Sequence, residues 1–433
     1  MATPEGARRW PRILFAAVGA VLALVASAFV VHRVLAPAEV VTAAQVGYPP
    51  PETARPRVIG TLNAAPLIVD DRLRIFATTR QVSADQPLDA KTRRTPYWSY
   101  RRWPAQLTGV VASGTTVVTR WSDGQLVALD ARTGRVRWRA EGPRPDQGYV
   151  GRRTGAATVY APAGLYTAGS PDGGRFVLVA GAGGRLGVDI ATGQVRWRAG
   201  AAPTCPDGTP AGVPGEGFTT AGGRLALTVD CAGTTSLRLY DVATGAPAAP
   251  WRPTGAAPAL QVTPLGCVVA RSDCRGLRTS SGGATRGWRV DGATPVAAPA
   301  LDAPETELLG DLALTPRGPE LLARSVSTGA QRWRWLGRAP ARILTTQSGR
   351  VHLRTEPGEG TDTGELVTLD AASGRERSRV PLTYGRDSTS WAPGFVYAAR
   401  GFVAVERLSE PVHPEADDDA YYLAAQPVIL AAT

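Results

Sequence analysis

Several residue types are scarce in this 433-residue chain, which has three histidines, one methionine, one lysine (Lys91) and one asparagine (Asn63). Histidine is the usual proton-transfer residue and the commonest metal ligand, so three copies leave little material for either role. The sequence contains no P-loop, no G-x-S-x-G elbow and no H-E-x-x-H pair. It therefore predicts a protein that is not an enzyme and that holds no cofactor.

Positive charge comes almost entirely from arginine. Lysine and arginine together number 48 against 37 acidic residues, which gives a formal net charge of +11. Arginine replaces lysine throughout, and alanine, glycine and proline are plentiful, a bias typical of a GC-rich genome such as an actinobacterial one. Because the arginines are scattered along the chain rather than gathered, we expect no nucleic-acid partner.

One long run of residues carries no charge at all, namely the nineteen positions from Ile13 to Val31. As a helix this run is roughly 28 Å long, close to the hydrocarbon thickness of a bilayer. A signal peptide usually has a shorter apolar core. The sequence therefore predicts a transmembrane signal-anchor helix over residues 13–35.

The charges before this run set its orientation. Arg8, Arg9 and Arg12 precede it, so the positive-inside rule places residues 1–12 in the cytoplasm and the bulk of the chain outside. We therefore expect a single-pass protein of the cell membrane. The alternative is secretion after signal-peptide cleavage near Ala26-Ser27-Ala28.

A proline-rich segment follows the predicted helix. Residues 36–57 show no sustained periodicity, and Pro49-Pro50-Pro51 favours an extended polyproline conformation. This segment is expected to be a linker, and residues 58–433 to form the folded domain.

The four cysteines all lie in the region predicted to be outside, where disulfides persist. Cys267 and Cys274 stand at the two ends of a predicted hairpin, which favours pairing them and leaves Cys205 for Cys231. A metal site is the alternative, but no pair has C-x-x-C spacing. We expect two disulfides.

A repeat runs through the predicted domain. "LDARTGRVRW" (Leu129–Trp138) and "VDIATGQVRW" (Val188–Trp197) keep an aspartate, a glycine and a tryptophan at the same spacing. Further copies, several of them degenerate, lie at Asp89 to Trp98, Asp241 to Trp251, Gly282 to Trp288, Ser325 to Trp333 and Asp370 to Ser378, and an eighth unit without the turn signature runs from Phe395 to Leu408.

The residue types explain what one unit does. Alternating apolar residues precede and follow the motif, as expected of two antiparallel strands joined by a turn. Aspartate accepts a hydrogen bond from the backbone two residues on, and glycine supplies the positive φ of the hairpin loop. The tryptophan then packs against the neighbouring sheet.

The motif glycines recur every 37 to 59 residues, room for one four-stranded sheet each. Such sheets bury both faces only by stacking, and radial closure leaves short, protected edges. The fold class is therefore all-β, a β-propeller of eight blades, with seven as the alternative. The last strand, around Tyr421 to Leu430, is expected to close the ring against Leu62 to Val69 or Leu73 to Ala77.

"DGQLVALDARTGRVRW" (Asp123–Trp138) resembles the repeat of the PQQ-like, or quinoprotein alcohol dehydrogenase-like, propellers. That resemblance implies either a quinone enzyme or the non-enzymatic branch that includes the outer-membrane assembly propeller. In the enzymes the quinone lies at the axis beside a calcium ion held by Glu, Asn and Asp, near an aspartate base and two adjacent cysteines. Asn63 precedes the first repeat and no two cysteines are adjacent. No quinone is therefore expected.

One stretch, "TRRTPYWSYRRWP", interleaves arginines with aromatic residues, an arrangement able to bind an acidic polymer. The simpler interpretation places its tryptophan within a blade. The residues of this candidate interaction surface are Arg93, Arg94, Trp98, Tyr100, Arg101, Arg102 and Trp103.

Two acidic runs, Glu356–Glu365 and His413–Tyr422, lack the spacing of a calcium-binding loop and are interpreted as solvated loops. The sequence thus predicts a membrane-anchored propeller that serves as a non-catalytic scaffold for an envelope protein or an acidic wall polymer. The alternatives are a sensor-like propeller that binds a small molecule and, last, a quinone-dependent dehydrogenase.

Overall fold

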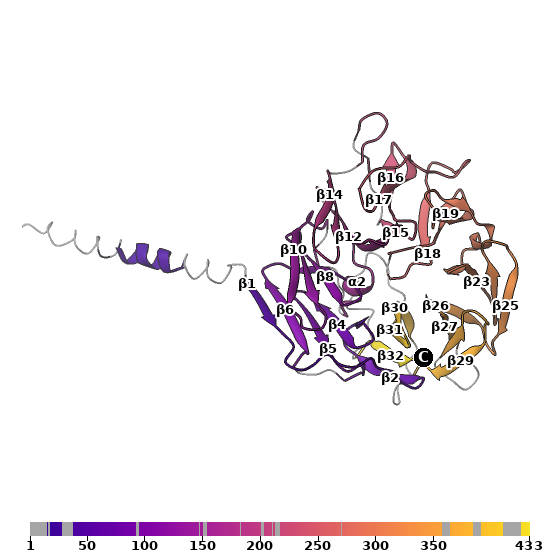
Figure 1. The fold of residues 1–433 in the computed structure, drawn as a ribbon, viewed down its shortest axis with the longest axis horizontal. Helices are drawn as coiled ribbons and strands as arrows, with labels where there is room; N and C mark the ends of the chain where they lie inside the picture. Colours follow the sequence, from indigo (N-terminus) through magenta and orange to yellow (C-terminus); the bar gives the residue numbers. More distant parts are fainter. Residues whose placement is uncertain are drawn as a thin grey trace, which may run out of the picture.

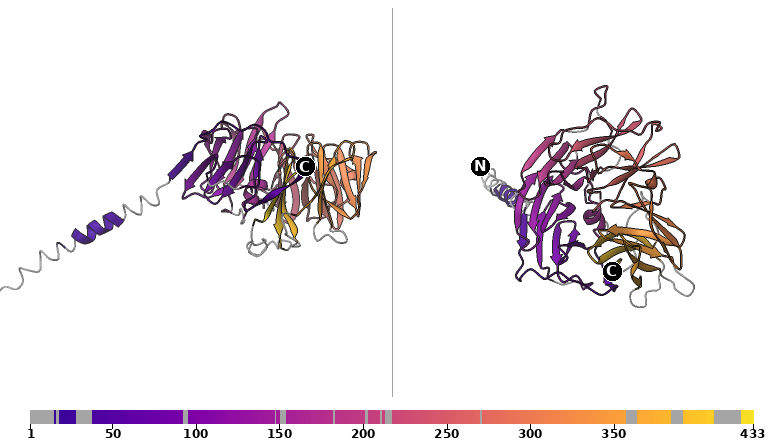
Figure 2. Two further views of the ribbon diagram at one scale, coloured as in Figure 1. Left: turned by 90° about the horizontal axis from the view of Figure 1, so that it is seen from below. Right: turned by 45° about the vertical axis from the view of Figure 1, so that its right-hand side comes forward.

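The computed structural model describes residues 15, 18–27, 38–91, 95–146, 148–149, 154–181, 183–200, 203–209, 211–212, 217–269, 271–356, 364–383, 391–409 and 426–433. These residues form eight antiparallel sheets around one axis (Figure 1). The blades stand side by side as a flat ring when viewed edge-on (Figure 2, left). The predicted all-β propeller is confirmed, with eight blades rather than seven.

Within each blade consecutive strands of the chain pair outward from the strand nearest the axis, and blades 1 and 8 each add an outermost strand from the start of the chain. Blade 1 contains β3 (Leu67–Val69), β4 (Leu73–Thr78), β5 (Gln81–Asp85) and β6 (Trp98–Trp103), and blade 2 contains β7 (Leu107–Ser113), β8 (Thr116–Trp121), β9 (Gln125–Asp130) and β10 (Val136–Glu141). Blade 3 contains β11 (Leu165–Gly169), β12 (Arg175–Gly181), β13 (Gly184–Asp189) and β14 (Val195–Ala199), and blade 4 contains β15 (Phe218–Thr220), β16 (Arg224–Cys231) and β17 (Thr234–Asp241). Blade 5 contains β18 (Gln261–Leu265), β19 (Gly276–Ser281), β20 (Ala284–Arg289) and β21 (Val296–Ala297), and blade 6 contains β22 (Glu307–Leu309), β23 (Leu312–Arg317), β24 (Glu320–Ser325) and β25 (Gln331–Leu336). Blade 7 contains β26 (Ala341–Gln347), β27 (Arg350–Thr355), β28 (Glu365–Asp370) and β29 (Glu376–Pro381), and blade 8 contains β30 (Ala392–Ala399), β31 (Phe402–Leu408), β32 (Val428–Ala432) and β2 (Arg57–Leu62).

The ring closes in blade 8, which combines both ends of the domain. Strand β32 pairs antiparallel with β2, from Arg57 opposite Ala432 to Leu62 opposite Val428. The expected partner, Leu62 to Val69 or Leu73 to Ala77, was therefore wrong apart from Leu62 itself, because β3 (Leu67–Val69) and β4 (Leu73–Thr78) are the inner strands of blade 1 instead. An outer strand has a free edge on which the last strand can pair, whereas β4 already pairs on both sides.

The segment expected to be a linker is partly a strand. Strand β1 (Ala38–Thr42) pairs antiparallel with β6, so blade 1 has a fifth, outermost strand. Glu39 on β1 contacts Arg102 of blade 1 at 3.3 Å and Arg139 of blade 2 at 2.6 Å. The chain next to β1 is thus fixed to two blades rather than freely extended.

Helix is rare in the described structure. Residues 18–27 are helical, and η2 (Pro299–Leu301) is a single 3₁₀ turn. Helix α2 (Ala156–Tyr160), in the connection from blade 2 to blade 3, lies near the axis, where it packs against strands of blades 1, 2 and 8. In the described part of the chain no helix is both long enough and apolar enough to span a membrane. Residues 1–14 and 28–37, and with them part of the predicted anchor, lie outside the described residues.

The motif aspartates form the expected turns between the third and fourth strands. Asp130 Oδ1 accepts the backbone N–H of Arg132 at 2.8 Å, and the aspartates of blades 3, 4 and 7 accept in the same way. The second carboxylate oxygen binds an arginine of the next strand: Arg137 with Asp130, Arg196 with Asp189 and Arg377 with Asp370. Hydrogen bonding from Arg377 lowers the pKa of Asp370 to about 2.

The motif tryptophans join neighbouring blades. Each indole N–H donates to the carbonyl that follows the aspartate of the next blade, and each ring covers that blade's motif glycine. We call this contact the tryptophan latch. The four latches join Trp98 to Ala131 and Gly134, Trp138 to Ile190 and Gly193, Trp197 to Val242 and Gly245, and Trp333 to Ala371 and Gly374.

Blade 5 departs from the repeat. Gly282 lies in the turn between the second and third strands, and Trp288 is on the third strand, so the motif predicted there is out of register. In place of a regular fourth strand, the described part of blade 4 has the isolated bridges Leu237 to Trp251 and Tyr240 to Pro247. Trp251 meets Trp288 edge to face, with ring centroids 5.0 Å apart.

The motif glycine has two roles: it adopts a left-handed backbone in the turn, and it packs under the latch tryptophan of the neighbouring blade. One pair of substitutions separates these two roles. Gly193 and Gly329 have matching φ angles of +76° and +72°, but a Cβ at Gly193 would lie 2.5 Å from Trp138, whereas nothing lies within 4 Å at Gly329. Gly329→Ala should cost about 1–2 kcal/mol of unfolding free energy for the left-handed backbone. Gly193→Ala should cost about 1–3 kcal/mol more through overpacking. Chemical denaturation of both variants measures the difference, and equal losses would rule out a packing role for Gly193.

Candidate functional site at the propeller axis

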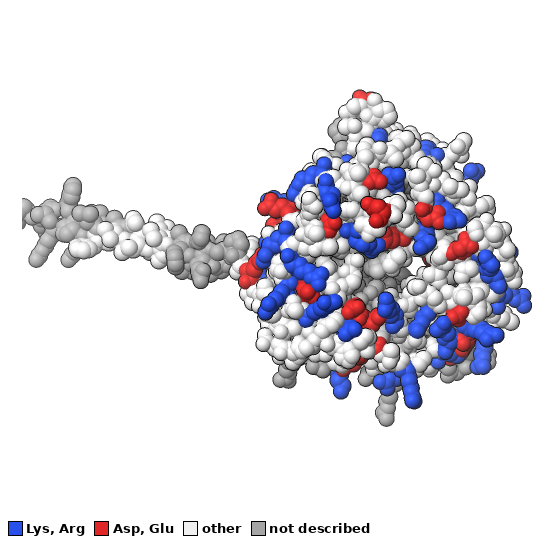
Figure 3. Space-filling model, in the orientation of Figure 1, with Lys and Arg blue, Asp and Glu red and all other residues white. Residues whose placement is uncertain are grey.

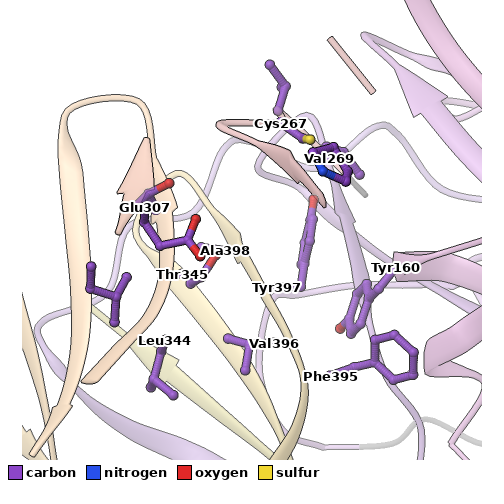
Figure 4. Close-up of a pocket in the computed structure, with 14 residues that line it drawn as sticks. Tyr160, Cys267, Val269, Glu307, Leu344, Thr345, Phe395, Val396, Tyr397 and Ala398 are labelled. Carbon is purple, nitrogen blue, oxygen red and sulfur yellow. The ribbon is translucent and has the colours of Figure 1, made fainter. Parts of the chain in front are cut away.

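A cavity of about 270 Å³ lies at the axis, where the inner strands of blades 5 to 8 face α2 (Figure 4). That volume suits a small ligand. The wall presents both apolar and polar groups, and its polar side chains are two threonines, two tyrosines and one carboxylate. The residues lining the cavity include Tyr160, Val268, Glu307, Ile343, Thr345 and Tyr397.

One wall is a loop of blade 5 closed by the Cys267–Cys274 disulfide. The loop reaches across blade 4, where Thr219 N–H donates to Arg271 O and Cys274 N–H donates to Thr219 O, both at 2.8 Å. It then reaches blade 3, where Asp273 binds Arg175 at 2.9 Å and accepts Gly169 N–H. This disulfide-closed loop holds blades 3 to 5 together, and in the described residues no tryptophan latch joins blade 4 to blade 5.

The disulfides are those that the sequence predicts. Cys205 pairs with Cys231 in blade 4, and Cys267 pairs with Cys274 at the axis. All four cysteines are therefore used. The alternative of a cysteine-bound metal is wrong, because a disulfide sulfur cannot serve as a thiolate ligand.

A stacked tyrosine pair forms the opposite wall. The rings of Tyr160 on α2 and Tyr397 on β30 are 4.8 Å apart and nearly parallel. Each hydroxyl is fixed by a carbonyl of blade 1, Tyr160 by Pro66 at 2.8 Å and Tyr397 by Ile68 at 3.1 Å. Burial raises the pKa of Tyr160 far above its usual value and that of Tyr397 strongly. Both tyrosines therefore stay protonated.

Glu307, at the start of β22, is the charged residue of the cavity wall. Figure 4 shows its side chain directed toward Thr345 and Ala398. Water reaches the carboxylate within the cavity, but protein surrounds it on the other sides. Burial raises the pKa of Glu307, although nearby Arg278 acts in the opposite direction.

The raised pKa of Glu307 predicts a stability effect. A carboxyl group whose pKa is raised on folding destabilises the folded state at neutral pH, and the penalty vanishes as pH falls below the ordinary value. We expect Glu307→Gln to unfold at a higher temperature than the native chain at neutral pH. The two should unfold together near about pH 3.5, where the carboxyl is protonated in both states. Paired thermal scans test this, and a lower melting temperature for Glu307→Gln at neutral pH would contradict it.

The cavity wall does not fit the quinone and calcium ion of the family's enzymes. Calcium takes six to eight oxygen ligands, several of them carboxylates, and Glu307 is the one carboxylate among the residues lining the cavity. Among the described residues no group of three or more His, Cys, Asp and Glu side chains could hold a metal. The acidic runs of residues 356–365 and 413–422 lie largely outside the described residues.

His352 lies away from the cavity, within blade 7. It is fully buried, and its ring nitrogens contact Gln347 at 2.8 Å and Thr368 at 3.0 Å. Burial and the neighbouring Arg350 lower its pKa to about 3. His352 is thus a neutral core residue rather than a proton-transfer group.

The predicted aromatic and arginine surface is mainly structural. Trp98 and Tyr100 have no exposed area, so their assignment to a surface is corrected: alternation along β6 points them into the core. Arg102 is nearly buried and binds Asp123 in a two-bond pair. Arg80 stacks over Trp103 at 4.1 Å, and Arg101 is exposed, while Arg93 and Arg94 lie outside the described residues.

Other arginines lie around the whole ring, interleaved with acidic residues (Figure 3). On the outer strands they bind carboxylates: Arg139, next to Trp138, binds Glu39, and Arg379 on β29 binds Glu365 and Glu376. This arrangement agrees with the scattered, solvated arginines that the sequence indicates.

Sequence reasoning missed Glu307, Tyr160 and Tyr397. They come from blade 6, from the connection between blades 2 and 3, and from blade 8, and no shared spacing links them. The one available signal was the propeller itself, because inner strands of all blades meet at the axis.

Comparison with known proteins agrees with this architecture. The sequence profile of the family described as outer membrane protein assembly factor BamB matches residues 52–163 and 182–342. Among curated proteins there is no match.

Three solved structures illustrate the similarity. BamB from Moraxella catarrhalis is 18% identical, with 86% of this chain and 96% of that chain covered and a TM-score of 0.41. Dihydro-heme d1 dehydrogenase NirN in complex with DHE is 17% identical (84% and 73% covered, TM-score 0.43). Quinohemoprotein alcohol dehydrogenase ADHIIG from Pseudomonas putida HK5 is 14% identical (81% and 70%, 0.38).

At these scores the three structures carry no argument about function. The family profile, in contrast, covers more than half of the chain. The protein therefore belongs to the family of PQQ-like repeat β-propellers described as outer membrane protein assembly factor BamB.

Proposed function

We propose that this protein is a membrane-anchored propeller outside the cytoplasm that acts as a non-catalytic docking platform for an envelope protein. The family is named after an assembly factor. The recurring aspartates and tryptophans are used to join blades, which leaves the loops and edges of the ring for binding. Two disulfides support an oxidising compartment, and the uncharged run from Ile13 to Val31 supports the anchor.

The observation that carries the proposal is the edge strand β1. In the described structure it pairs only with β6, so its outer backbone groups face solvent. Val40 and Val41 are 55% and 43% exposed, and Val46, just beyond the strand, is 60% exposed. An open strand edge with exposed apolar side chains is a template on which a partner strand pairs. A protein partner fits this edge better than an acidic polymer does.

Photo-crosslinking of the full-length chain in its native membrane tests the proposal. Because the chain has a single lysine, lysine-directed reagents would crosslink almost none of its surface. A photoreactive amino acid is therefore placed at Val41. A second copy is placed at Val296, a valine that is 61% exposed on the outer strand β21 of blade 5. We expect one defined envelope protein to be crosslinked from position 41 and not from position 296.

Two outcomes contradict the proposal. One is the absence of any protein adduct from position 41, and the other is the same set of adducts from both positions, which indicates random collision. Protease added to intact cells provides the control on topology, because a propeller outside the membrane is accessible to it.

A further inference from the structure

Blade 6 has a turn built like those that receive a latch tryptophan, but no tryptophan of the described chain covers it. In this turn, between β24 and β25, Gly329 has a φ of +72° and its N–H donates to Ser325 O at 2.8 Å. Gly134 of blade 2 has a φ of +71° and makes the corresponding bond at 2.7 Å. Asp311 replaces the motif aspartate, because its carboxylate accepts the Ser327 N–H at 2.9 Å and the hydroxyls of Ser325 and Ser327.

The space over this turn is open. Strand β21, the fourth strand of the preceding blade, contains no tryptophan. No described atom lies within 4 Å of a Cβ placed on Gly329, whereas a Cβ on Gly193 or Gly374 would lie 2.5 Å or 2.6 Å from a tryptophan ring. Gly329 is accordingly exposed, while the glycines of the four latches are buried or half-buried. The turn is therefore complete but uncovered.

The carbonyl that a latch tryptophan would reach in blade 6 is that of Val326. In the latched blades the corresponding residues are buried, and each of their carbonyls accepts an indole N–H at 2.8–2.9 Å. These residues are Ala131, Ile190, Val242 and Ala371. Val326 is only half-buried, and among the described residues its carbonyl has no donor. Val326 packs with Ala298 and Leu301 of blade 5, neither of which supplies an indole N–H.

The chain has no spare tryptophan for this turn. Every tryptophan from Trp98 to Trp391 is buried or half-buried. Trp10 precedes the uncharged run from Ile13 to Val31, so the sequence places it on the cytoplasmic side, opposite to the propeller. A tryptophan that covers Gly329 must therefore come from another protein.

Positive charge lies beside the same turn. In blades 2, 3 and 7 an arginine seven residues after the motif aspartate binds that aspartate. These arginines are Arg137, Arg196 and Arg377. Arg332 holds this place in blade 6, where Ser325 replaces the aspartate, and Arg324 lies opposite Gln331 on the adjacent strand. Both arginines are exposed, and in the part of the chain that the structure describes neither forms an ion pair. Carboxylates of a partner would find two cations there.

We propose that the turn of blade 6 is a docking site for a tryptophan of another protein, flanked in that protein by acidic residues. The indole ring rests on Gly329 and its N–H donates to the Val326 carbonyl, as each latch tryptophan does within the ring. The neighbouring carboxylates pair with Arg324 and Arg332. One anchoring tryptophan with charge pairs at its rim is a common design of protein interfaces. This site goes beyond docking at β1, because it lies on another blade and takes a different chemical group.

Fluorescence anisotropy of the full chain with a labelled peptide, Gly-Asp-Trp-Asp-Gly, tests this inference. We expect saturable binding. A peptide with alanine in place of tryptophan should bind at least about tenfold more weakly, because it lacks both the ring and the N–H donor. A peptide with lysine in place of both aspartates should bind about fivefold more weakly, since exposed ion pairs contribute modestly.

A matched pair of glycine variants locates the binding. Gly329→Ala places a Cβ where the ring would lie, so it should weaken binding of the tryptophan peptide at least about tenfold. Gly318 has a φ of +61° and likewise no described atom within 4 Å, but it lies at the other end of β24, in the turn after β23. Gly318→Ala should therefore carry the same backbone strain and bind the peptide like the native chain.

A second pair of variants tests the charges. Arg332→Gln should weaken binding of the aspartate-flanked peptide about two- to fivefold. Arg338→Gln removes an exposed arginine beyond the other end of β25 and should leave binding unchanged.

The inference is overturned if the tryptophan peptide shows no saturable binding to the native chain, if the alanine peptide binds equally well, or if Gly329→Ala binds like the native chain. An equal loss in Gly318→Ala would also overturn it, because backbone strain rather than a blocked site would then explain the loss. None of these results bears on docking at β1, which is tested by crosslinking from position 41.

Discussion

Trp138→Ala is expected to lower the free energy of unfolding by about 3–5 kcal/mol, measured by chemical denaturation. The substitution empties the space between blades 2 and 3 and leaves the Ile190 carbonyl without the indole N–H that it accepts at 2.9 Å. It also uncovers Gly193, on which the ring rests. A large side chain and a buried hydrogen bond are lost together.

Two further variants assign this loss to the latch. Trp138→Phe keeps one aromatic ring but removes the N–H and part of the indole's contact area, so it should recover part of the stability. Trp251→Ala removes a tryptophan that is only half-buried and packs on Trp288 rather than on a motif glycine, so its loss should be smaller. Equal losses for Trp138→Ala and Trp251→Ala would mean that the latch has no special role.

Arg120→Met is expected to cost about 3–5 kcal/mol of unfolding free energy, although it replaces a charge with an apolar side chain in the core. Arg120 is 1% exposed, and its guanidinium donates to the carbonyls of Ala163, Gly164, Pro143 and Ala180 at 2.8–3.1 Å. These acceptors belong to the connections and strands of blades 2 and 3. Methionine fills the space but offers these carbonyls no donor, and among them Gly164 O keeps a backbone partner, the N–H of Ala180.

Burial lowers the pKa of Arg120 to about 10, so the side chain remains charged at neutral pH. Arg120→Lys keeps the charge, but a single ammonium cannot reach four carbonyls on two sides, so it should rescue only part of the loss. Arg101→Met, at an exposed position on β6, is the matched control and should change stability by less than about 0.5 kcal/mol. Normal stability of Arg120→Met would show that water satisfies those carbonyls.

The sequence predicted local chemistry better than it predicted contacts between blades. The turn at Asp130 and the hairpin of β9 and β10 depend on neighbours within about ten residues, and both were confirmed. Neither motif alone reveals that Trp138 rests on Gly193 of the following blade. Within its own motif, Gly193 is already explained as a turn residue and Trp138 as a strand residue. The packing partner is set by how the blades stack.

The same limit explains the candidate site and the errors. Glu307 shows no pattern in sequence, because its importance comes from what the ring places around it. Gly282 was assigned to the motif because a glycine and a tryptophan stood at roughly the right spacing, although Gly282 belongs to the preceding turn and Trp288 to the third strand. The unit with Gly329 and Trp333 keeps the motif spacing, and its tryptophan forms a latch although serine replaces the aspartate. The exact spacing is therefore more informative than the presence of the residue types.

The closing sheet of blade 8 also sets the order of events during synthesis. Thr61 and Gln426, which are hydrogen bonded at this sheet, are separated by 365 residues. Strand β2 leaves the ribosome early, yet its partner β32 follows only after seven other blades have been made. Until then β2 has an unpaired edge, and contacts so distant in sequence form slowly. One nascent strand therefore lacks its sheet partner for most of the protein's translation.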